Sequence, residues 1–377
     1  MISIFTKGKL IKYAETRLFG RNLAPEDIGK IELYNGSLPS SLEQIIRREH
    51  GDFERVVQEN GREPIYFYGP PFGKGTLLIP QYSGFGRGER YRRLIEEYIA
   101  VSGKNMEFEI RHLNNNERDA NIYYENHAYD FVAGLFVPSE KYKDRRVFPS
   151  CDIKDIRKII FGSIDAVAKA TKIIAKGQSE YLDAQITEIK GEKILNIGPV
   201  YADQAKHIIY KMLREYAALA ENEGKKLEID LFMFGRVGGL EENMQRNDLV
   251  YPTAIIDDVD LKNGKRFEYP MHNVLAQGKS ELNFNVPTLV DESIEQLEEA
   301  RKNGCICVEL ESRESAEAVN DARRWFHRFL DINFGFAGYV SDLPLKGDTL
   351  ADEYNLYKGE QETLGRIIDF IKHHEIR

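Results

Sequence analysis

The spacing of apolar residues becomes regular beyond about residue 150. In residues 201–224, apolar side chains recur every three or four positions, which predicts a long amphipathic helix that Gly224 ends. The stretch 227–235, LEIDLFMFG, is apolar almost throughout, as expected of a strand covered on both faces. Helical and strand-like stretches go on alternating to the end of the chain. This alternation predicts an α/β domain with a central mixed, largely parallel sheet flanked by helices.

The same patterns predict the other elements of this domain. Lys190-Gly191 has the composition of a tight turn, so residues 180–198 are predicted as two strands joined there. Further helices are predicted in 161–177, 290–304, 315–331 and 360–374, and further strands in 247–257, 305–311 and 334–342.

The first 150 residues are less regular and rich in aromatic side chains. One or two helices are predicted in 40–59, a short helix in 90–103, strands in 63–69 and 75–80, and a long polar loop in 112–131. We therefore expect two units. Residues 1–150 form an extra N-terminal α+β region of unknown role, and residues 151–377 form the main α/β domain.

The composition and charge of the chain exclude several classes of function. The chain has 377 residues, 42% of them hydrophobic, which is enough for a full core. Its net charge of −9 argues against nucleic-acid binding, which needs a basic face. Three cysteines without paired spacing indicate neither a disulfide framework nor a metal site. No apolar run approaches the ~20 residues of a membrane span, and the N-terminus lacks a signal-peptide pattern. We expect a soluble, cytoplasmic protein that does not bind membranes.

Unusual residues follow four of the predicted strands. Ligands of open α/β sheets collect at the carboxyl ends of strands, so these residues predict a pocket. They are Gly198 after the strand in 192–197, Gly235, Arg236, Gly238 and Gly239 around the end of the next strand, Leu310 and Glu311 after CICVE, and Ser341 and Asp342 after GFAGYV.

The stretches KILNIGPVYADQ, DLFMFGRVGGLEEN, CVELES and VSDLPLKGD occur in this order. Through these four stretches, the last 220 or so residues of the chain resemble the purine nucleoside phosphorylase and nucleosidase superfamily. Within that superfamily they are most similar to AMP nucleosidases. The resemblance implies cleavage of the N-glycosidic bond of a purine nucleotide or nucleoside. It also implies that no cofactor is needed and that the protein is a homo-oligomer, a hexamer or a trimer.

By this resemblance, Asp342 is the general acid that protonates the leaving base, and Glu311 holds the ribose hydroxyls. Leu310 stands where the superfamily usually has methionine, and Ser341 precedes the catalytic aspartate. The glycines Gly198, Gly235, Gly238 and Gly239 would let backbone amides approach the substrate in loops. Arg236 would suit an anion, although a surface arginine is an equally good interpretation. Asp342 could instead cap the turn at Pro344.

Two departures from the superfamily pattern bear on the reaction. Where phosphorylases carry phosphate-binding arginines, this chain has Ala166 and Met233. Water is then the natural nucleophile, which favours a nucleosidase. A phosphate-using phosphorylase and an inactive nucleotide-binding protein stay open as alternatives. The interval from Glu311 to Asp342 is also longer than usual by about two helical turns, which raises the question of whether the two carboxylates converge.

Overall fold

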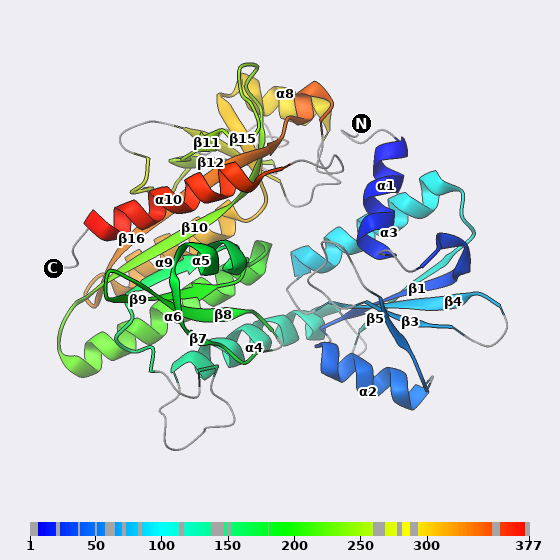
Figure 1. Ribbon diagram of the computed structural model, residues 1–377, viewed down its shortest axis with the longest axis horizontal. Coiled ribbons are helices and arrows are strands. Elements are labelled where there is room, and N and C mark those ends of the chain that lie inside the picture. The colour runs from blue at the N-terminus through cyan, green and yellow to red at the C-terminus, as the bar shows by residue number, and fades with distance from the viewer. Residues whose placement is uncertain are drawn as a thin grey trace.

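In the computed structural model, the strands form two separate sheets (Figure 1). Every strand of the first sheet lies before residue 113, and every strand of the second lies after residue 157. The structure describes residues 7–19, 23–36, 38–49, 51–56, 65–69, 73–81, 85–112, 117–136, 147–148, 152–179, 181–258, 268–276, 281–286, 293–348 and 355–373.

Within the described residues, the N-terminal sheet has five strands in the order β2-β3-β4-β1-β5. β4, β1 and β5 run parallel, whereas β2, β3 and β4 form antiparallel pairs. Helices α1 and α3 lie on one side of this sheet and α2 on the other (Figure 1). The elements are α1 (Lys7–Leu18), η1 (Pro25–Asp27), β1 (Ile28–Asn35), α2 (Pro39–Glu49), β2 (Glu54–Val56), β3 (Ile65–Tyr68), β4 (Gly75–Gln81), α3 (Phe85–Ser102) and β5 (Glu107–His112).

Of the one or two helices predicted in 40–59, the structure has a helix only in the first part, and a strand begins at Glu54. Helix α2 ends at Glu49, and the chain then passes through Gly51. The φ of 87° at Gly51 is one that glycine adopts without strain. The chain continues to β2, which begins at Glu54, so the second part of this segment starts as a strand and not as a helix.

The polar loop predicted in 112–131 is also wrong, because most of it belongs to α4 (Glu117–Phe136). In the second half of α4, Ala128, Val132 and Leu135 are buried in one cluster with Tyr216 of α6. The apolar face of this helix therefore packs against the second unit. The asparagine-rich composition of its surroundings concealed that face.

The second sheet is mixed. Parallel pairs join β9, β6, β10 and β16, and likewise β12, β14 and β15, with antiparallel pairs toward both edges. Its strands are β6 (Lys158–Phe161), β7 (Lys172–Lys176), β8 (Ala184–Ile189), β9 (Glu192–Ile197), β10 (Leu227–Gly239), β11 (Leu249–Val250), β12 (Ala254–Asp257), β13 (Glu268–Pro270), β14 (Leu282–Asn285), β15 (Cys305–Glu309) and β16 (Leu330–Asp342). The prediction of a central mixed sheet is confirmed.

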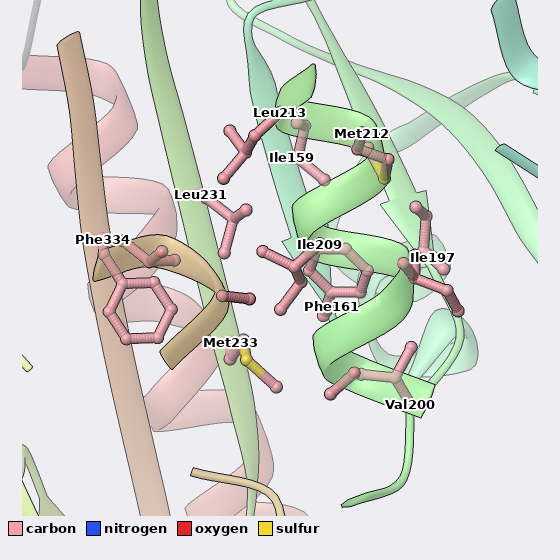
Figure 2. Close-up of a cluster of buried hydrophobic side chains, with 14 of the residues drawn as sticks. Ile159, Phe161, Ile197, Val200, Ile209, Met212, Leu213, Leu231, Met233 and Phe334 are labelled. Atoms are coloured by element: carbon pink, nitrogen blue, oxygen red, sulfur yellow. The ribbon is translucent and has the colours of Figure 1, made fainter. Parts of the chain in front are cut away.

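Helices cover both faces of the central strands. Side chains of α6 (Ala202–Glu223) and α9 (Ser312–Phe326) share a buried cluster with one face, and α5 (Ile164–Ala170) and α10 (Tyr357–His373) share another with the opposite face. Figure 2 shows Leu231 and Met233 of β10 beside Ile209 of α6. The other helices in the described part of this domain are α8 (Ile294–Lys302) and η4 (Pro344–Lys346).

Two predicted helices of this domain show what the sequence pattern captured. Helix α6 ends, as predicted, at Gly224, which has φ 64°. The helix predicted in 161–177 instead stops at Ala170, and β7 follows it. The β-branched residues Thr171, Ile173 and Ile174 favour the strand. Among the described residues, none of the helices has the length and apolar character to cross a membrane.

Candidate active site

Three strands of the second sheet meet beside Gly238. In the register of the sheet, Gly238 pairs with Asp342 of β16 and with Val308 of β15. Because neighbouring strands lie about 4.8 Å apart, the backbones at Asp342 and Val308 are about 10 Å apart. Helix α9 and the whole of β16 take up the long interval after Glu311. The extra length therefore does not carry the two motifs to different parts of the molecule.

A β-bulge precedes Asp342. Val237 pairs with Val340 and Gly238 pairs with Asp342, so Ser341 is an extra residue on β16. A bulge bends its strand and re-aims the side chains beside it. The Ser341 hydroxyl lies 3.2 Å from the Val237 carbonyl oxygen and 2.6 Å from Oδ1 of Asp342. Its single proton can go to either acceptor, and the hydroxyl ties the bulge to the carboxyl group.

The carboxyl group of Asp342 is buried, since the residue is only 5% exposed. Burial raises the pKa of Asp342 to about 7, and the nearby Asp348 carboxylate adds to the rise. The Ser341 hydrogen bond and the guanidinium groups of Arg246 and Arg236 act in the opposite direction. Near neutral pH this carboxyl group is therefore protonated in a large fraction of molecules, which is the state that a general acid needs.

The turn after β16 is held by Asp348 rather than by Asp342. Asp348 Oδ2 accepts a hydrogen bond of 3.2 Å from the Leu343 N–H and forms an ion pair with Arg246. Lys346 Nζ donates to the Met244 carbonyl oxygen at 3.0 Å, which ties this turn to the segment after β10. The described contacts thus give the turn-capping role to Asp348 and leave the Asp342 carboxyl group bonded to Ser341.

The two glutamates after β15 differ in their contacts. Glu309 is 8% exposed, and its Oε2 accepts hydrogen bonds from the backbone N–H groups of Glu311 at 2.8 Å and Ser312 at 2.6 Å. It caps α9, where the positive end of the helix favours a carboxylate. Glu311 is the N-cap residue of α9 and is half-buried, as is Leu310 beside it.

The alternation of side chains along a strand does not relate Glu309 to Glu311, because β15 ends at Glu309, and Glu311 has φ −108° and ψ −10°, outside strand geometry. Because β15 runs antiparallel to β10, the residue after Val308 lies on the side of Gly238 where Val237 is. Glu309 is committed to the helix, so Glu311 is the stronger candidate for a substrate contact.

The glycine segment after DLFMF was predicted to be a loop. It is instead the last part of β10. A Cβ atom at Gly238 would lie 2.7 Å from Val308 Cγ1, and one at Gly239 would lie 3.0 Å from Leu343 Cδ2. These two glycines let strands and the turn after β16 pack closely. Gly235 has open space beside it, and Arg236 is exposed.

Gly198 directly follows β9, at the same end of the sheet. Through β6, Ile197 and Met233 align with the same residue, Phe161, so Gly198 is close to the level of Gly235. Its N–H donates to the Asp183 carbonyl oxygen at 2.7 Å. Gly198 and Gly235 therefore flank the same edge of the sheet, about two strand spacings apart.

The two positions where phosphorylases carry arginine are apolar here. Met233 is 6% exposed and lies in the cluster with α6 and α9, near Phe161 and Ile209 (Figure 2). Ala166 is 1% exposed and lies in the cluster on the opposite face of the sheet. Neither position supplies a positive charge for inorganic phosphate.

Glu314, in the first turn of α9, was not singled out from the sequence. Burial raises its pKa to about 8, and Glu309 and Glu317 add to the rise. Its Oε2 is buried and has no hydrogen-bond partner in the described part of the chain. No local pattern predicts this burial, because an acidic residue early in a helix is usually a surface side chain that complements the helix dipole.

The described residues contain no group of three or more His, Cys, Asp or Glu side chains that could hold a metal ion. Cys305 and Cys307 are buried cysteines of β15. Burial raises the pKa of Cys307 above its usual range, so its thiol stays protonated at neutral pH.

No protein-family model matches the chain. No curated protein matches it by sequence. Among solved structures, it is similar to an S-adenosylhomocysteine nucleosidase from Streptococcus pyogenes, with a TM-score of 0.43 and 11% identity over 59% of this chain and 99% of that one.

Similar solved structures also include a futalosine hydrolase of Helicobacter pylori (TM-score 0.43, 10% identity, 58% of this chain and 99% of that one). A purine nucleoside phosphorylase from Toxoplasma gondii is a third (TM-score 0.42, 13% identity, 58% and 91%).

Proposed function

We propose that residues 151–377 are the catalytic domain of a hydrolase that cleaves the N-glycosidic bond of an AMP-like purine nucleotide or nucleoside. The products are the free base and ribose or ribose 5-phosphate. The observation that supports this most is the Asp342 carboxyl group, which is buried, has a pKa of about 7, and follows a bulge at the end of β16.

In this reaction Asp342 is the general acid. Cleavage leaves positive charge on the sugar and negative charge on the departing base. Protonation of the base by a carboxylic acid near N7 lowers the barrier, and such help is typically worth ~10²–10⁴-fold. An aspartate with an ordinary pKa would already be ionised at pH 7, so the raised pKa is the property that the role requires.

Glu311 is assigned to the ribose. A carboxylate can accept hydrogen bonds from both sugar hydroxyls and hold the sugar in a reactive pose. Its neighbour Glu309 caps α9 and so fixes the start of the helix. We assign the space beside Gly235 to the substrate, with Gly198, Arg236, Gly238, Gly239, Leu310 and Ser341 around it.

Water is the nucleophile in this proposal. The side chains at Met233 and Ala166 are buried in apolar clusters on opposite faces of the sheet, and an anion there would lack a partner. Hydrolysis needs no phosphate site, and therefore fits these positions better than phosphorolysis.

The test is a substrate panel of adenosine, AMP, ATP, inosine and GMP, each assayed for free base with and without inorganic phosphate. We expect base release without phosphate and no increase when phosphate is added. Release that depends on phosphate would identify a phosphorylase. Binding of every purine without release would identify an inactive nucleotide-binding protein.

Two further expectations accompany the proposal. The chain acts as a homo-oligomer, a trimer or hexamer, in the cytoplasm, with a small purine compound as its substrate. Light scattering after size-exclusion chromatography gives the mass of the assembly, and a monomeric mass would contradict this expectation.

A further inference from the structure

Helix α1 of the N-terminal unit contacts the turn that follows Asp342. Nζ of Lys9 donates a hydrogen bond of 2.6 Å to the carbonyl oxygen of Gly347, although the two residues are 338 positions apart in the chain. Gly347 has φ 76° and ends the short helix η4. The last carbonyl groups of a helix favour a positively charged donor, so a lysine suits this place. The proposed reaction gives this contact no task.

Helix α1 is itself held against α3. Nη2 of Arg90 donates a hydrogen bond of 2.7 Å to the Tyr13 hydroxyl. The Tyr98 hydroxyl donates one of 3.0 Å to Oε1 of Glu15. Buried side chains of α1 also share an apolar cluster with α3 and β1. Lys9 therefore reaches the turn from a helix whose position is fixed by the rest of the N-terminal unit.

The same apolar cluster extends to both sides of the candidate site. It includes Leu10 of α1, and the half-buried side chains of Leu310 and Leu345 pack against it. Leu310 directly precedes Glu311, and Leu345 lies in η4, three residues after Asp342. The N-terminal unit thus shares a core with the two segments that carry the proposed catalytic residues.

The peptide group that Lys9 contacts is also bonded to the start of the turn. The Gly347 carbonyl and the Asp348 N–H belong to one planar peptide group. Lys9 binds its oxygen, and its N–H donates to the Leu343 carbonyl oxygen at 3.3 Å. The Asp348 carboxylate accepts in return from the Leu343 N–H. Since Leu343 directly follows Asp342, Lys9 acts on the backbone beside the proposed general acid.

The protonation of Asp342 depends on this turn. Burial is the main cause of its raised pKa, and the Asp348 carboxylate adds to the rise. The Ser341 hydrogen bond, Arg246 and Arg236 lower the pKa. A turn that opened more often would let water reach the carboxyl group and would move Asp348 away from it. Both changes lower the pKa of Asp342, so a smaller fraction of the acid would be protonated at neutral pH.

We propose that Lys9 is a positioning residue for the active site. From α1, it holds the turn 343–348 in the conformation that keeps the Asp342 carboxyl group buried and near Asp348. This inference rests on the proposed role of Asp342 as the general acid. It gives the N-terminal unit a part in that role, as a support for the turn beside the acid.

The first test compares variants of two lysines of α1. Lys9→Met removes the charged donor and keeps an apolar side chain of similar length. Amide hydrogen exchange, measured without substrate, should become roughly three to ten times faster in residues 343–348, because one hydrogen bond that holds the turn is gone. Lys12→Met is the matched control, since it removes the same charge from an exposed position of α1 and should leave this exchange unchanged. Lys9→Arg keeps a donor and should behave like the parent.

The pH dependence of base release is a second readout, which a general loss of stability would not produce. At pH 5 the acid is protonated both in the parent and in Lys9→Met, so kcat/KM should be similar. At pH 8 a lower pKa leaves fewer molecules protonated. A pKa lowered by half a unit reduces kcat/KM of Lys9→Met there by roughly threefold. Lys12→Met and Lys9→Arg should follow the parent at both pH values.

Failure of this proposal and failure of the proposed reaction give different results. Unchanged exchange in Lys9→Met would overturn the positioning role, and so would equal effects of Lys9→Met and Lys12→Met. A kcat/KM that is lower by the same factor at pH 5 and pH 8 would overturn it too. If the parent releases no base, the proposed reaction is wrong, whereas faster exchange in Lys9→Met alone still supports the hold of Lys9 on the turn.

Discussion

Replacing Asp342 by asparagine should change how the stability of the protein depends on pH. The parent carboxyl group has a pKa of about 7 when folded, against an ordinary value of 3.8. Between these values the folded chain keeps a proton that the unfolded chain has lost. The contribution of Asp342 to stability is therefore fully present below pH 3.8 and is lost as pH rises to about 7. Asparagine has no such loss.

The magnitude follows from the shift. A shift of roughly three pKa units corresponds to about 4 kcal/mol in total, at about 1.4 kcal/mol per unit. Between one and two kcal/mol of this, as an order of magnitude, is already lost at pH 5, so the free energy of unfolding of Asp342→Asn should rise relative to the parent by roughly 2–3 kcal/mol between pH 5 and pH 8.

Urea unfolding of both proteins at pH 5 and pH 8 measures this difference. Glu314 also has a raised pKa, but it is present in both proteins, so its contribution cancels. Asp321→Asn, which changes an exposed aspartate of α9, is the control and should show no such trend. A difference between Asp342→Asn and the parent that does not vary with pH would show that the carboxyl group titrates normally.

Three further outcomes test the packing and the site. Gly238→Ala should destabilise the protein by ~1–3 kcal/mol, because its Cβ would lie 2.7 Å from Val308 Cγ1. Gly235→Ala should fold normally, since its Cβ enters open space, and should raise KM for the purine substrate. Chemical denaturation and steady-state kinetics check this pair, and equal stability of the two variants would contradict the assigned packing. Glu311→Gln should weaken ribose binding and lower kcat/KM for base release while leaving the thermal midpoint within a few degrees of the parent. An unchanged kcat/KM would remove Glu311 from the site. Ser293→Ala should lose the capping box of α8, in which the Ser293 hydroxyl accepts from the Gln296 N–H at 3.2 Å, at a cost of ~1 kcal/mol in unfolding free energy. Urea denaturation with no change in midpoint would count against that cap.

Much of the fold could be predicted where local signals and packing agree. The apolar face of α6 and the glycine that ends this helix are both local signals in the sequence. The apolar run of β10 likewise indicates a strand that is buried on both faces. The helix α4 and the strand β7 were missed for opposite reasons. In α4, polar residues beside the buried positions made the segment resemble a loop. In β7, the apolar residues also have helical spacing, so the predicted helix was continued from α5 into this edge strand.

The site could be predicted only in part. The order of the motifs placed Asp342 and Glu311 at strand exits, and the structure brings those exits to either side of Gly238. The bulge at Ser341 depends on a register between strands about a hundred residues apart, which no local pattern records. The capping of α9 by Glu309 and the raised pKa of Glu314 likewise arise from tertiary packing.

In the proposed reaction, Asp342 gives its proton to the departing base. The pH–rate profile of base release, measured for the parent and for Asp342→Asn with the best substrate of the panel, tests this most directly. We expect kcat/KM of the parent to be level below pH 7 and to fall tenfold per pH unit well above it, because the acid has a pKa of about 7 in the free enzyme. We also expect Asp342→Asn to be slower by at least ~10²-fold at pH 6 and to show no inflection near pH 7. Base release by Asp342→Asn at the parent rate, with the same profile, would contradict this role of Asp342.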